Sequence, residues 1–288
     1  MLGPRSERLV IIKGAGDLAT GVGHRLWRAG FPLLHTEVPE PTVVRRTVSF
    51  AEAVFEGETL VEGVRAEAIR EGNPGSQAQR ALELIAGGTV PVLVDPEARV
   101  VGELKPWALV DAIMAKRNLG THITDAEVVI ALGPGFEAGV DVHAVIETQR
   151  GHDLGRVITE DGATPNTGVP GEVMGFSKER LLRAPSGGVF RPLKSIGDRV
   201  EAGEAVAEVG GVPLRAEISG VLRGLLRGGI RVSEGFKVGD IDPRGSREHC
   251  FTISDKARAV GGGVLEALMM FLNKAPVRVP GSLGREQS

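Results

Sequence analysis

The sequence predicts an α/β chain: a Rossmann-like, mostly parallel sheet, then a small all-β barrel-sandwich and a C-terminal helix. Three observations support this fold class. A short apolar strand runs into a glycine turn near the N-terminus, strands alternate with helices through the first half, and the second half contains an internal repeat. We expect a nucleotide- or ligand-binding domain at 1–175, the barrel-sandwich at 176–245, and the helix and tail at 246–288.

Composition narrows the classes of partner and the compartment. The 288 residues are 42% hydrophobic, which is enough for two cores, and the net charge is only −3. That balance predicts neither a nucleic-acid surface nor a polybasic membrane patch. No apolar run approaches the roughly 20 residues of a membrane span, and the start lacks the apolar core of a signal peptide. With Cys250 as the single thiol, we expect a cytoplasmic protein.

The first strand leads into a dinucleotide-binding pattern. Gly14, Gly16 and Ala19 fit G-x-G-x-x-G/A between an apolar strand and an amphipathic helix. The next strand, read from "FPLLHTE", ends in Glu37, near the point where an acidic side chain would meet a ribose hydroxyl. Gly14, Gly16, Asp17 and Glu37 are therefore candidate ligand-binding residues.

Asp17 leaves a second interpretation open. It stands where the first helix begins, so its carboxylate could cap the free N–H groups and repel an anion. The turn would then be self-capped and hold no nucleotide. Arg45 and Arg46 follow the second strand and offer a clamp for a phosphate or carboxylate, or are simply exposed arginines.

Loops after later strands are expected to join this turn. In parallel sheets the carboxyl ends of the strands share one edge, where ligands bind. The strand 128–132 runs into Gly133 and Gly135, which are candidate contacts at that edge. Asn166 lies in a turn-rich stretch that either lines the same cleft or serves as a linker.

The densest group of acid–base side chains follows the last of these strands. Residues 140–147 alternate in polarity except at Val145, and His143 lies four residues before Glu147 on the predicted polar face. His152 stands in the polar turn that follows. We take His143, Glu147 and His152 as candidate catalytic residues, with a structural His–carboxylate pair as the alternative. Their spacing matches no metalloenzyme signature, so we expect no metal site.

The second half contains two copies of one unit. Residues 184–209 align without a gap to residues 216–241 at an offset of 32. Units this short must pack on each other, which predicts a pseudo-twofold sandwich. "GDRVEAGEAVAEV" resembles the biotinyl/lipoyl carrier family, but the hairpin at 210–213 lacks the acceptor lysine. We therefore expect no biotin or lipoate, and a docking module whose exposed edge could support a homo-oligomer.

Longer blocks over about residues 12–272 resemble the selenium-dependent molybdenum hydroxylase accessory protein family. They include "IKGAGDLATGVGHRL", "VRRTVSFAEAVFEG", "VLVDPE", "GPGFEAGVDVHAVIETQRGHDLGRVI", "TPNTGVPGEV" and "DIDPRGSREHCFTISDKARAV". The resemblance implies a maturation factor for such hydroxylases, with the hydroxylase or its other maturation factors as partners. It also implies a molybdopterin dinucleotide or another nucleotide as ligand. It carries over no catalytic residues, and a lone thiol does not support selenium chemistry in this chain.

Three functions therefore stay open at this point. The first, which we favour, is a non-catalytic maturation factor that binds the molybdenum cofactor or its nucleotide part. The second is a nucleotide- or NAD(P)-dependent enzyme that uses His143, Glu147 and His152 as acid–base groups. The third is a scaffold whose two domains bind only protein.

Overall fold

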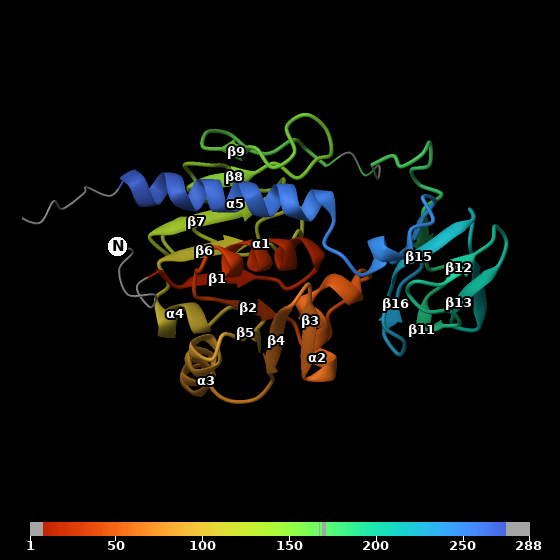
Figure 1. The fold of residues 1–288 in the computed structure, drawn as a ribbon, viewed down its shortest axis with the longest axis horizontal. Helices are drawn as coiled ribbons and strands as arrows, with labels where there is room; N and C mark the ends of the chain where they lie inside the picture. The colour runs from red at the N-terminus through yellow and green to blue at the C-terminus, as the bar shows by residue number, and fades with distance from the viewer. Residues whose placement is uncertain (1–7, 167, 169–170, 275–288) are drawn as a thin grey trace, which may run out of the picture.

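The computed structural model describes residues 8–166, 168 and 171–274. A large sheet with its helices forms one part and a smaller β-unit lies beside it (Figure 1). The large sheet has nine strands. From edge to edge they are β3 (Glu58–Val61), β4 (Val64–Ile69), β5 (Val90–Val94), β2 (Leu33–Glu37), β1 (Val10–Lys13), β6 (Ala108–Asp111), β7 (Val128–Leu132), β8 (Ala144–Ile146) and β9 (Val157–Ile158).

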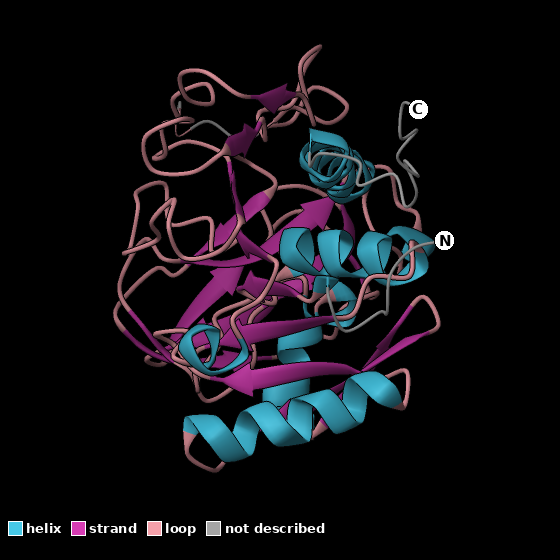
Figure 2. Ribbon diagram, turned by 90° about the vertical axis from the view of Figure 1, so that its left-hand side faces the viewer, coloured by secondary structure: helices cyan, strands magenta, loops and turns pink. Residues whose placement is uncertain are grey.

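Helices cover both faces of this sheet (Figure 2). The inner strands are apolar on both faces, as expected for parallel strands buried between two layers. Val10 and Ile12 belong to one core, while Ile11 between them belongs to the other. The first core packs against α1 (Asp17–Arg28), α2 (Ala53–Glu56) and α5 (Asp255–Lys274), the second against α3 (Pro74–Ala86) and α4 (Val100–Leu104).

The strand order creates a crevice beside β1. From β1 the chain continues to β2 on one side, and it later returns to β6 on the other. The connections after these strands therefore leave in opposite directions. Open α/β sheets bind ligands at such a switch point, outside the carboxyl ends of the strands.

The C-terminal helix is an integral layer of the large sheet. It packs along α1 and against β7, β8 and β9. Glycines allow the close approach: a Cβ at Gly21 would lie 2.7 Å from the Cβ of Ala257, and one at Gly263 would overlap the carbonyl oxygen of Gly155. The chain therefore returns from the small β-unit to complete the fold of its first half.

The smaller unit consists of two four-stranded sheets around a common core. The predicted repeat recurs in it, because each strand of residues 188–209 has a counterpart 32 residues later. The second strand of each copy pairs with the first strand of the other copy. One sheet holds β10 (Leu181–Arg183), β17 (Lys237–Asp242), β15 (Gly220–Leu225) and β12 (Arg199–Val200), the other β14 (Val212–Arg215), β13 (Ala205–Val209), β11 (Gly188–Pro192) and β16 (Arg231–Val232).

The fold class predicted from the sequence is wrong in two respects. The large sheet is mixed, since β3 and β9 run antiparallel to their neighbours at its two edges. The smaller unit is not a barrel-sandwich, because in the described residues its two sheets stay separate and no closed barrel forms. The repeat predicted two similar units correctly, but pairing between the copies builds two open sheets. The boundaries at 175 and 245 stay predictions, and the tail at 275–288 lies outside the described residues.

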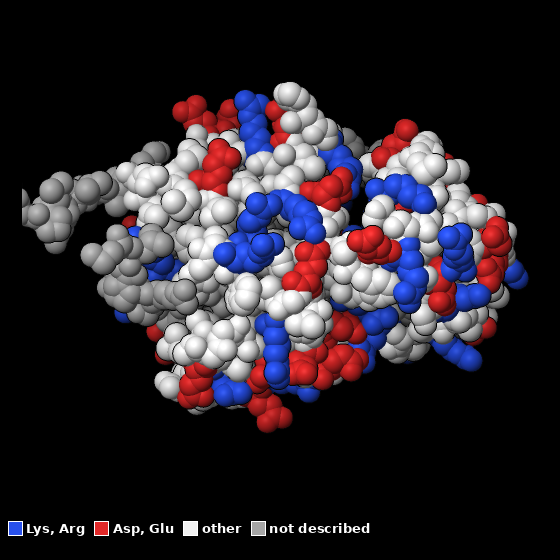
Figure 3. All heavy atoms as spheres, viewed as in Figure 1, with Lys and Arg blue, Asp and Glu red and all other residues white. Residues whose placement is uncertain are grey.

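Short 3₁₀ helices lie where the large sheet and the smaller unit meet. They are η2 (Arg46–Val48) and η3 (Phe50–Glu52) after β2, and η4 (Arg247–Cys250) before α5. Acidic and basic side chains are interspersed on the face shown in Figure 3. Of the helices in the described part, none is long and apolar enough to cross a membrane.

Candidate functional site

Two adjoining cavities lie at the carboxyl edge of the large sheet. The first, which we call the glycine-turn cavity, has a volume of about 560 Å³ and occupies the switch point beside β1. Its lining comes from the segments that follow β1, β2, β5 and β6. The residues used below are Gly14, Gly16, Asp17, Glu37, Arg45, Asp95, Met114 and Lys116.

The glycine turn is held by its neighbours on both sides. Gly14 has φ +92°, and a Cβ there would lie 3.1 Å from the carbonyl oxygen of Ala112. Its own carbonyl accepts a 2.8 Å hydrogen bond from Nδ1 of His35 on β2. A carbonyl can only accept, so the neutral His35 ring carries its proton on Nδ1. The turn therefore needs glycine at position 14 and a histidine beneath it.

Glu37 faces the cavity from the end of β2. Its Oε2 accepts a 2.8 Å hydrogen bond from the N–H of Ala15, and its Oε1 accepts one from Val38. Burial raises the pKa of this carboxyl, although the two N–H donors oppose the shift. Each carboxylate oxygen keeps a lone pair for a further donor. Glu37 is thus placed to accept hydroxyl groups of a ligand.

Arg45 supplies a buried cation to the same cavity. It is only 5% exposed, and one amino group donates to the carbonyls of His249 and Thr252. Its buried Nε has no hydrogen-bond partner in the described residues. Burial lowers the pKa of Arg45, and the nearby carboxylate of Asp17 opposes that shift. A buried guanidinium with an unused donor points to an acceptor that a ligand would bring.

The second cavity, which we call the lysine–arginine cavity, adjoins the first. It has a volume of about 450 Å³ and shares Met114 and Lys116 with the glycine-turn cavity. Its walls come from the loops after β6 and β8, from the smaller unit and from the start of α5. The polar and charged lining residues are Lys116, Thr148, Gln149, Arg150, Thr164, Asn166, Arg183, Lys237 and Lys256.

A buried polar contact fixes the loop shared by the two cavities. Lys13, at the end of β1, donates from Nζ to the hydroxyl of Thr121 at 2.6 Å. That hydroxyl donates in turn to Asp111 at the end of β6, also at 2.6 Å. The three side chains are buried, so they form a satisfied unit. They tie both ends of the segment that carries Met114 and Lys116 to the sheet.

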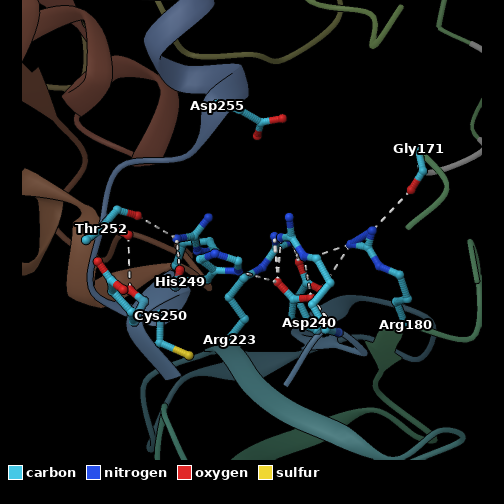
Figure 4. A network of polar contacts seen from close by, with 12 residues as sticks. Gly171, Arg180, Arg223, Asp240, His249, Cys250, Thr252 and Asp255 are labelled. Atoms are coloured by element: carbon cyan, nitrogen blue, oxygen red, sulfur yellow. Dashed lines mark hydrogen bonds and ion pairs between the residues drawn. The ribbon is translucent and has the colours of Figure 1, made fainter. Parts of the chain in front are cut away.

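A network of arginines and aspartates lies in the smaller unit, and most of its members are buried. Figure 4 shows Arg180 and Arg223 converging on Asp240. Arg223 also approaches Asp242, whose carboxylate accepts bonds of 2.9 and 2.7 Å from Arg244. Burial opposes the charge of Asp242, but its arginine partners outweigh this and lower its pKa to about 2. These residues line neither cavity, so they stabilise the smaller unit rather than contact a ligand.

The structure gathers most of the predicted ligand-binding residues at one edge. Gly14, Gly16, Asp17 and Glu37 line the glycine-turn cavity, and Asn166 lines the lysine–arginine cavity. Gly133 and Gly135 line neither cavity but permit close packing behind them. A Cβ at Gly133 would meet the hydroxyl of Thr148, and one at Gly135 would meet the backbone of Arg117. The ligand-binding role of these residues stays a prediction.

The structure does not bring the three candidate catalytic residues together. Strand β8 covers only residues 144–146, so His143 precedes it and Glu147 follows it. At about 3.3 Å per residue, the two residues stand roughly 13 Å apart, at opposite ends of β8. Nδ1 of His143 accepts a hydrogen bond from the N–H of Val129 and its ring contacts Phe271, while His152 lies exposed in a turn.

Glu147 instead organises the wall of the lysine–arginine cavity. Its two carboxylate oxygens accept the N–H groups of Gln149 and Thr164 at 2.7 and 2.8 Å. Burial would raise its pKa, but these donors outweigh burial and lower it. In the described residues no cluster of three or more His, Cys, Asp and Glu side chains could hold a metal ion.

Sequence reasoning missed the cations Lys116, Lys237 and Lys256. They come from three segments far apart in the chain, and no local spacing links them. Lys237 lies inside the repeat, where we would expect a lysine on the exposed face of a strand. Arg45 carried a signal, because it lies in the segment after the second strand, but its burial was not predictable.

The buried ring of His35 gives the protein a specific acid sensitivity. Burial lowers its pKa from 6.5 to about 4, although the bond to Gly14 opposes the shift. Unfolding lets the ring take up a proton, so the stability that His35 contributes is complete above about pH 6.5 and falls toward pH 4, by at most about 1.4 kcal/mol per pH unit. Urea unfolding between pH 7 and 4.5 should show a smaller loss in His35→Gln than in the exposed control His122→Gln. Equal losses in the two variants would contradict this role.

Comparison with known proteins gives few relatives. No family model matches the chain. It is 51% identical over 271 residues to the uncharacterized protein YqeB of Escherichia coli K12, covering 94% of this chain and 49% of that protein. The chain therefore spans about half the length of this curated relative.

Among solved structures, similarity is distant. The succinylglutamate desuccinylase/aspartoacylase of Rhodobacter sphaeroides is 21% identical, with 30% of this chain and 29% of that chain covered and a TM-score of 0.19. An aspartoacylase family protein of Mesorhizobium loti is 14% identical, with 64% and 86% covered and a TM-score of 0.24. The ectoine utilization protein EutE (DoeB) of Ruegeria pomeroyi is 11% identical, with 82% and 85% covered and a TM-score of 0.25. At these scores none of them assigns an activity to this chain.

These comparisons correct the family expected from the sequence. The solved structures are desuccinylase and aspartoacylase family proteins, and the sequence relative is uncharacterized. The expected membership among selenium-dependent molybdenum hydroxylase accessory proteins is therefore withdrawn, because no family model supports it and the matching relative is uncharacterized. The maturation role rested on that membership and falls with it. The molybdopterin ligand and the hydroxylase partner are not tested by these comparisons and stay predictions from the sequence.

Proposed function

We propose that this protein is a nucleotide-dependent enzyme that holds its nucleotide in the glycine-turn cavity. One observation carries the proposal: this single cavity combines a carboxylate acceptor, a glycine turn before a helix, and a buried cation with an unused donor. These are Glu37, the turn at 14–16 and Arg45. Together they match the hydroxyl groups and the phosphate of a nucleotide.

The geometry supports a definite orientation of the nucleotide. Ribose hydroxyls would donate to the free lone pairs of Glu37, beside the turn. The phosphate would lie toward the first N–H groups of α1 and the Nε of Arg45. Asp17 begins α1, and Arg45, Lys237 and Lys256 all interact electrostatically with its carboxylate. These cations offset the repulsion that Asp17 would otherwise exert on a phosphate.

The enzyme assignment departs from the acid–base residues expected from the sequence. His143 lies at the amino end of β8, whereas this cavity lies at the carboxyl ends of the strands. The two carboxylate oxygens of Glu147 each accept a backbone N–H. We place the reacting part of the substrate in the adjoining lysine–arginine cavity, where lysines with lowered pKa face open volume. A cytoplasmic location, which the single thiol indicates, is part of this proposal.

Calorimetric titration of the chain with AMP, ADP, NAD and NADP tests the proposal. We expect at least one nucleotide to bind the wild type, and Glu37→Gln to weaken that binding about tenfold, because one ribose acceptor is lost. The matched control is Glu266→Gln, an exposed glutamate on α5, which should bind like the wild type. Absence of binding to the folded wild type, or equal affinity in Glu37→Gln, would contradict the proposal.

A further inference from the structure

We infer that the lysine–arginine cavity binds a small dianion, a phosphate or dicarboxylate group, that belongs to the second substrate. The inference rests on the proposed function, because it names the substrate class that would react beside the nucleotide. The two cavities share Met114 and Lys116, so groups bound in them would be neighbours. The cavity volume of about 450 Å³ suits a small molecule.

The lining of this cavity has one sign of charge. Five cationic side chains line it, and no Asp or Glu is among the described lining residues. Neutral donors and acceptors stand between the cations and would orient a bound group. The cations are Lys116, Arg150, Arg183, Lys237 and Lys256, and the neutral polar side chains are Thr148, Gln149, Thr164 and Asn166.

Two of the five cations already have partners. Arg150 forms a bidentate pair with Asp255 at 2.7 and 2.9 Å, and Arg183 donates to the carbonyl of Gly235 at 2.8 Å. In contrast, within the described residues the side-chain ammonium groups of Lys237 and Lys256 form no hydrogen bond and no ion pair. Cations that are partly withdrawn from water and left unpaired are costly unless an anion joins them.

Lys237 enters the cavity from β17 of the smaller unit. Burial lowers its pKa, and the charges of Arg223 and Arg180 lower it further. Asp240 and Asp17 oppose the shift, but the pKa still lies below its ordinary value. Asp240 is itself held by the two arginines, so it is not available as a full partner for Lys237.

Lys256 enters from the second residue of α5. Burial lowers its pKa, and the charges of Arg150 and Lys237 add to this effect. Asp17 and Glu147 act in the opposite direction without restoring the ordinary pKa. A dianion between Lys237 and Lys256 would favour the charged form of both lysines. Its binding should therefore weaken as pH rises.

The test uses sulfate and succinate as probes in calorimetric titration of the full chain, each with and without the nucleotide that binds. Sulfate keeps its charge across the pH range, so a change in its affinity reports the protein. We expect binding that weakens as the pH rises toward 10.5, the ordinary pKa of lysine, and that is weakened about tenfold by Lys237→Met or Lys256→Met. The methionine side chain keeps the length of lysine, and thermal unfolding would verify the fold of each variant. The control is Lys194→Met, since Lys194 pairs with Glu204 on the smaller unit and lines neither cavity.

The affinities for sulfate and succinate distinguish two classes of second substrate. Stronger binding of sulfate would indicate a phosphorylated substrate, and stronger binding of succinate a dicarboxylate. Failure of both probes to bind at millimolar concentration, or equal binding by the folded lysine variants, would overturn the inference. Dianion binding without any nucleotide binding would support this site and refute the proposed function, so the two failures are distinguishable.

Discussion

Asp240→Ala is expected to lower the free energy of unfolding by about 3–5 kcal/mol, because it leaves buried charges without their partner. Asp240 is 3% exposed, and both Arg180 and Arg223 are paired with its carboxylate (Figure 4). Among the described residues, Arg180 would keep only its bond to the carbonyl of Gly171. Within the same part of the chain, Arg223 would keep only its 3.5 Å contact with Asp242.

The two arginines cannot compensate for this loss. The Nε of each is already buried without a hydrogen-bond partner in the described residues. Urea unfolding at pH 7 measures the change. Asp153→Ala is the matched control: Asp153 pairs with Arg156 on the surface, and removal of such a pair costs about 0–1 kcal/mol. Equal losses in the two variants would show that the buried pairs of Asp240 do not stabilise the fold.

Gly263→Ala is expected to destabilise the protein by about 1–3 kcal/mol, because α5 leaves no space for a methyl group there. A Cβ at this position would overlap the carbonyl oxygen of Gly155 and lie 2.9 Å from a methyl carbon of Ile146. The main obstacle is backbone, so the helix itself would have to shift away from β8 and the loop that follows it. The favourable helix propensity of alanine is too small to offset this.

The neighbouring glycine provides the control for this prediction. A Cβ at Gly262 would meet nothing within 4 Å, although both glycines lie in the same helix. Gly262→Ala should therefore stabilise the protein by about 0.5–1 kcal/mol, as alanine restricts the unfolded chain. Thermal unfolding of the two variants should shift the midpoint in opposite directions. A shift in the same direction for both would mean that α5 does not pack closely at residue 263.

Local patterns predicted the first part of the site well. The apolar run before Gly14, the helix after Gly16 and the strand that ends in Glu37 all appear in the structure as expected. Each depends on neighbours in the sequence: a glycine that takes positive φ, a helical period, and an acidic residue that ends a strand. These short-range signals sufficed to place the glycine-turn cavity.

Pairing between distant segments was not predictable in the same way. The repeat at residues 184–241 predicted two similar units, but whether the strands close a barrel depends on which strands pair. The polarity of residues 140–146 predicted one strand, whereas a turn replaces its first half because the backbone of 137–142 bonds to itself. His143 therefore lies outside β8, just before its first residue.

The cationic part of the site depends on tertiary structure alone. Lys116, Lys237 and Lys256 meet only because the chain leaves the large sheet, forms the smaller unit and returns as α5. No spacing in the sequence predicts that the chain returns to the large sheet. The close contacts of Gly21 with Ala257 and of Gly263 with Gly155 hold α5 in its place.

A crystal structure of the chain with bound ADP is the decisive experiment for a nucleotide site in the glycine-turn cavity. We expect ribose hydroxyl groups within hydrogen-bond distance of Glu37, and a phosphate between the start of α1 and Arg45. The Nε of Arg45 should then gain the acceptor that it lacks within the described residues. ADP bound elsewhere, with the glycine-turn cavity holding only water at a saturating concentration, would refute the nucleotide site.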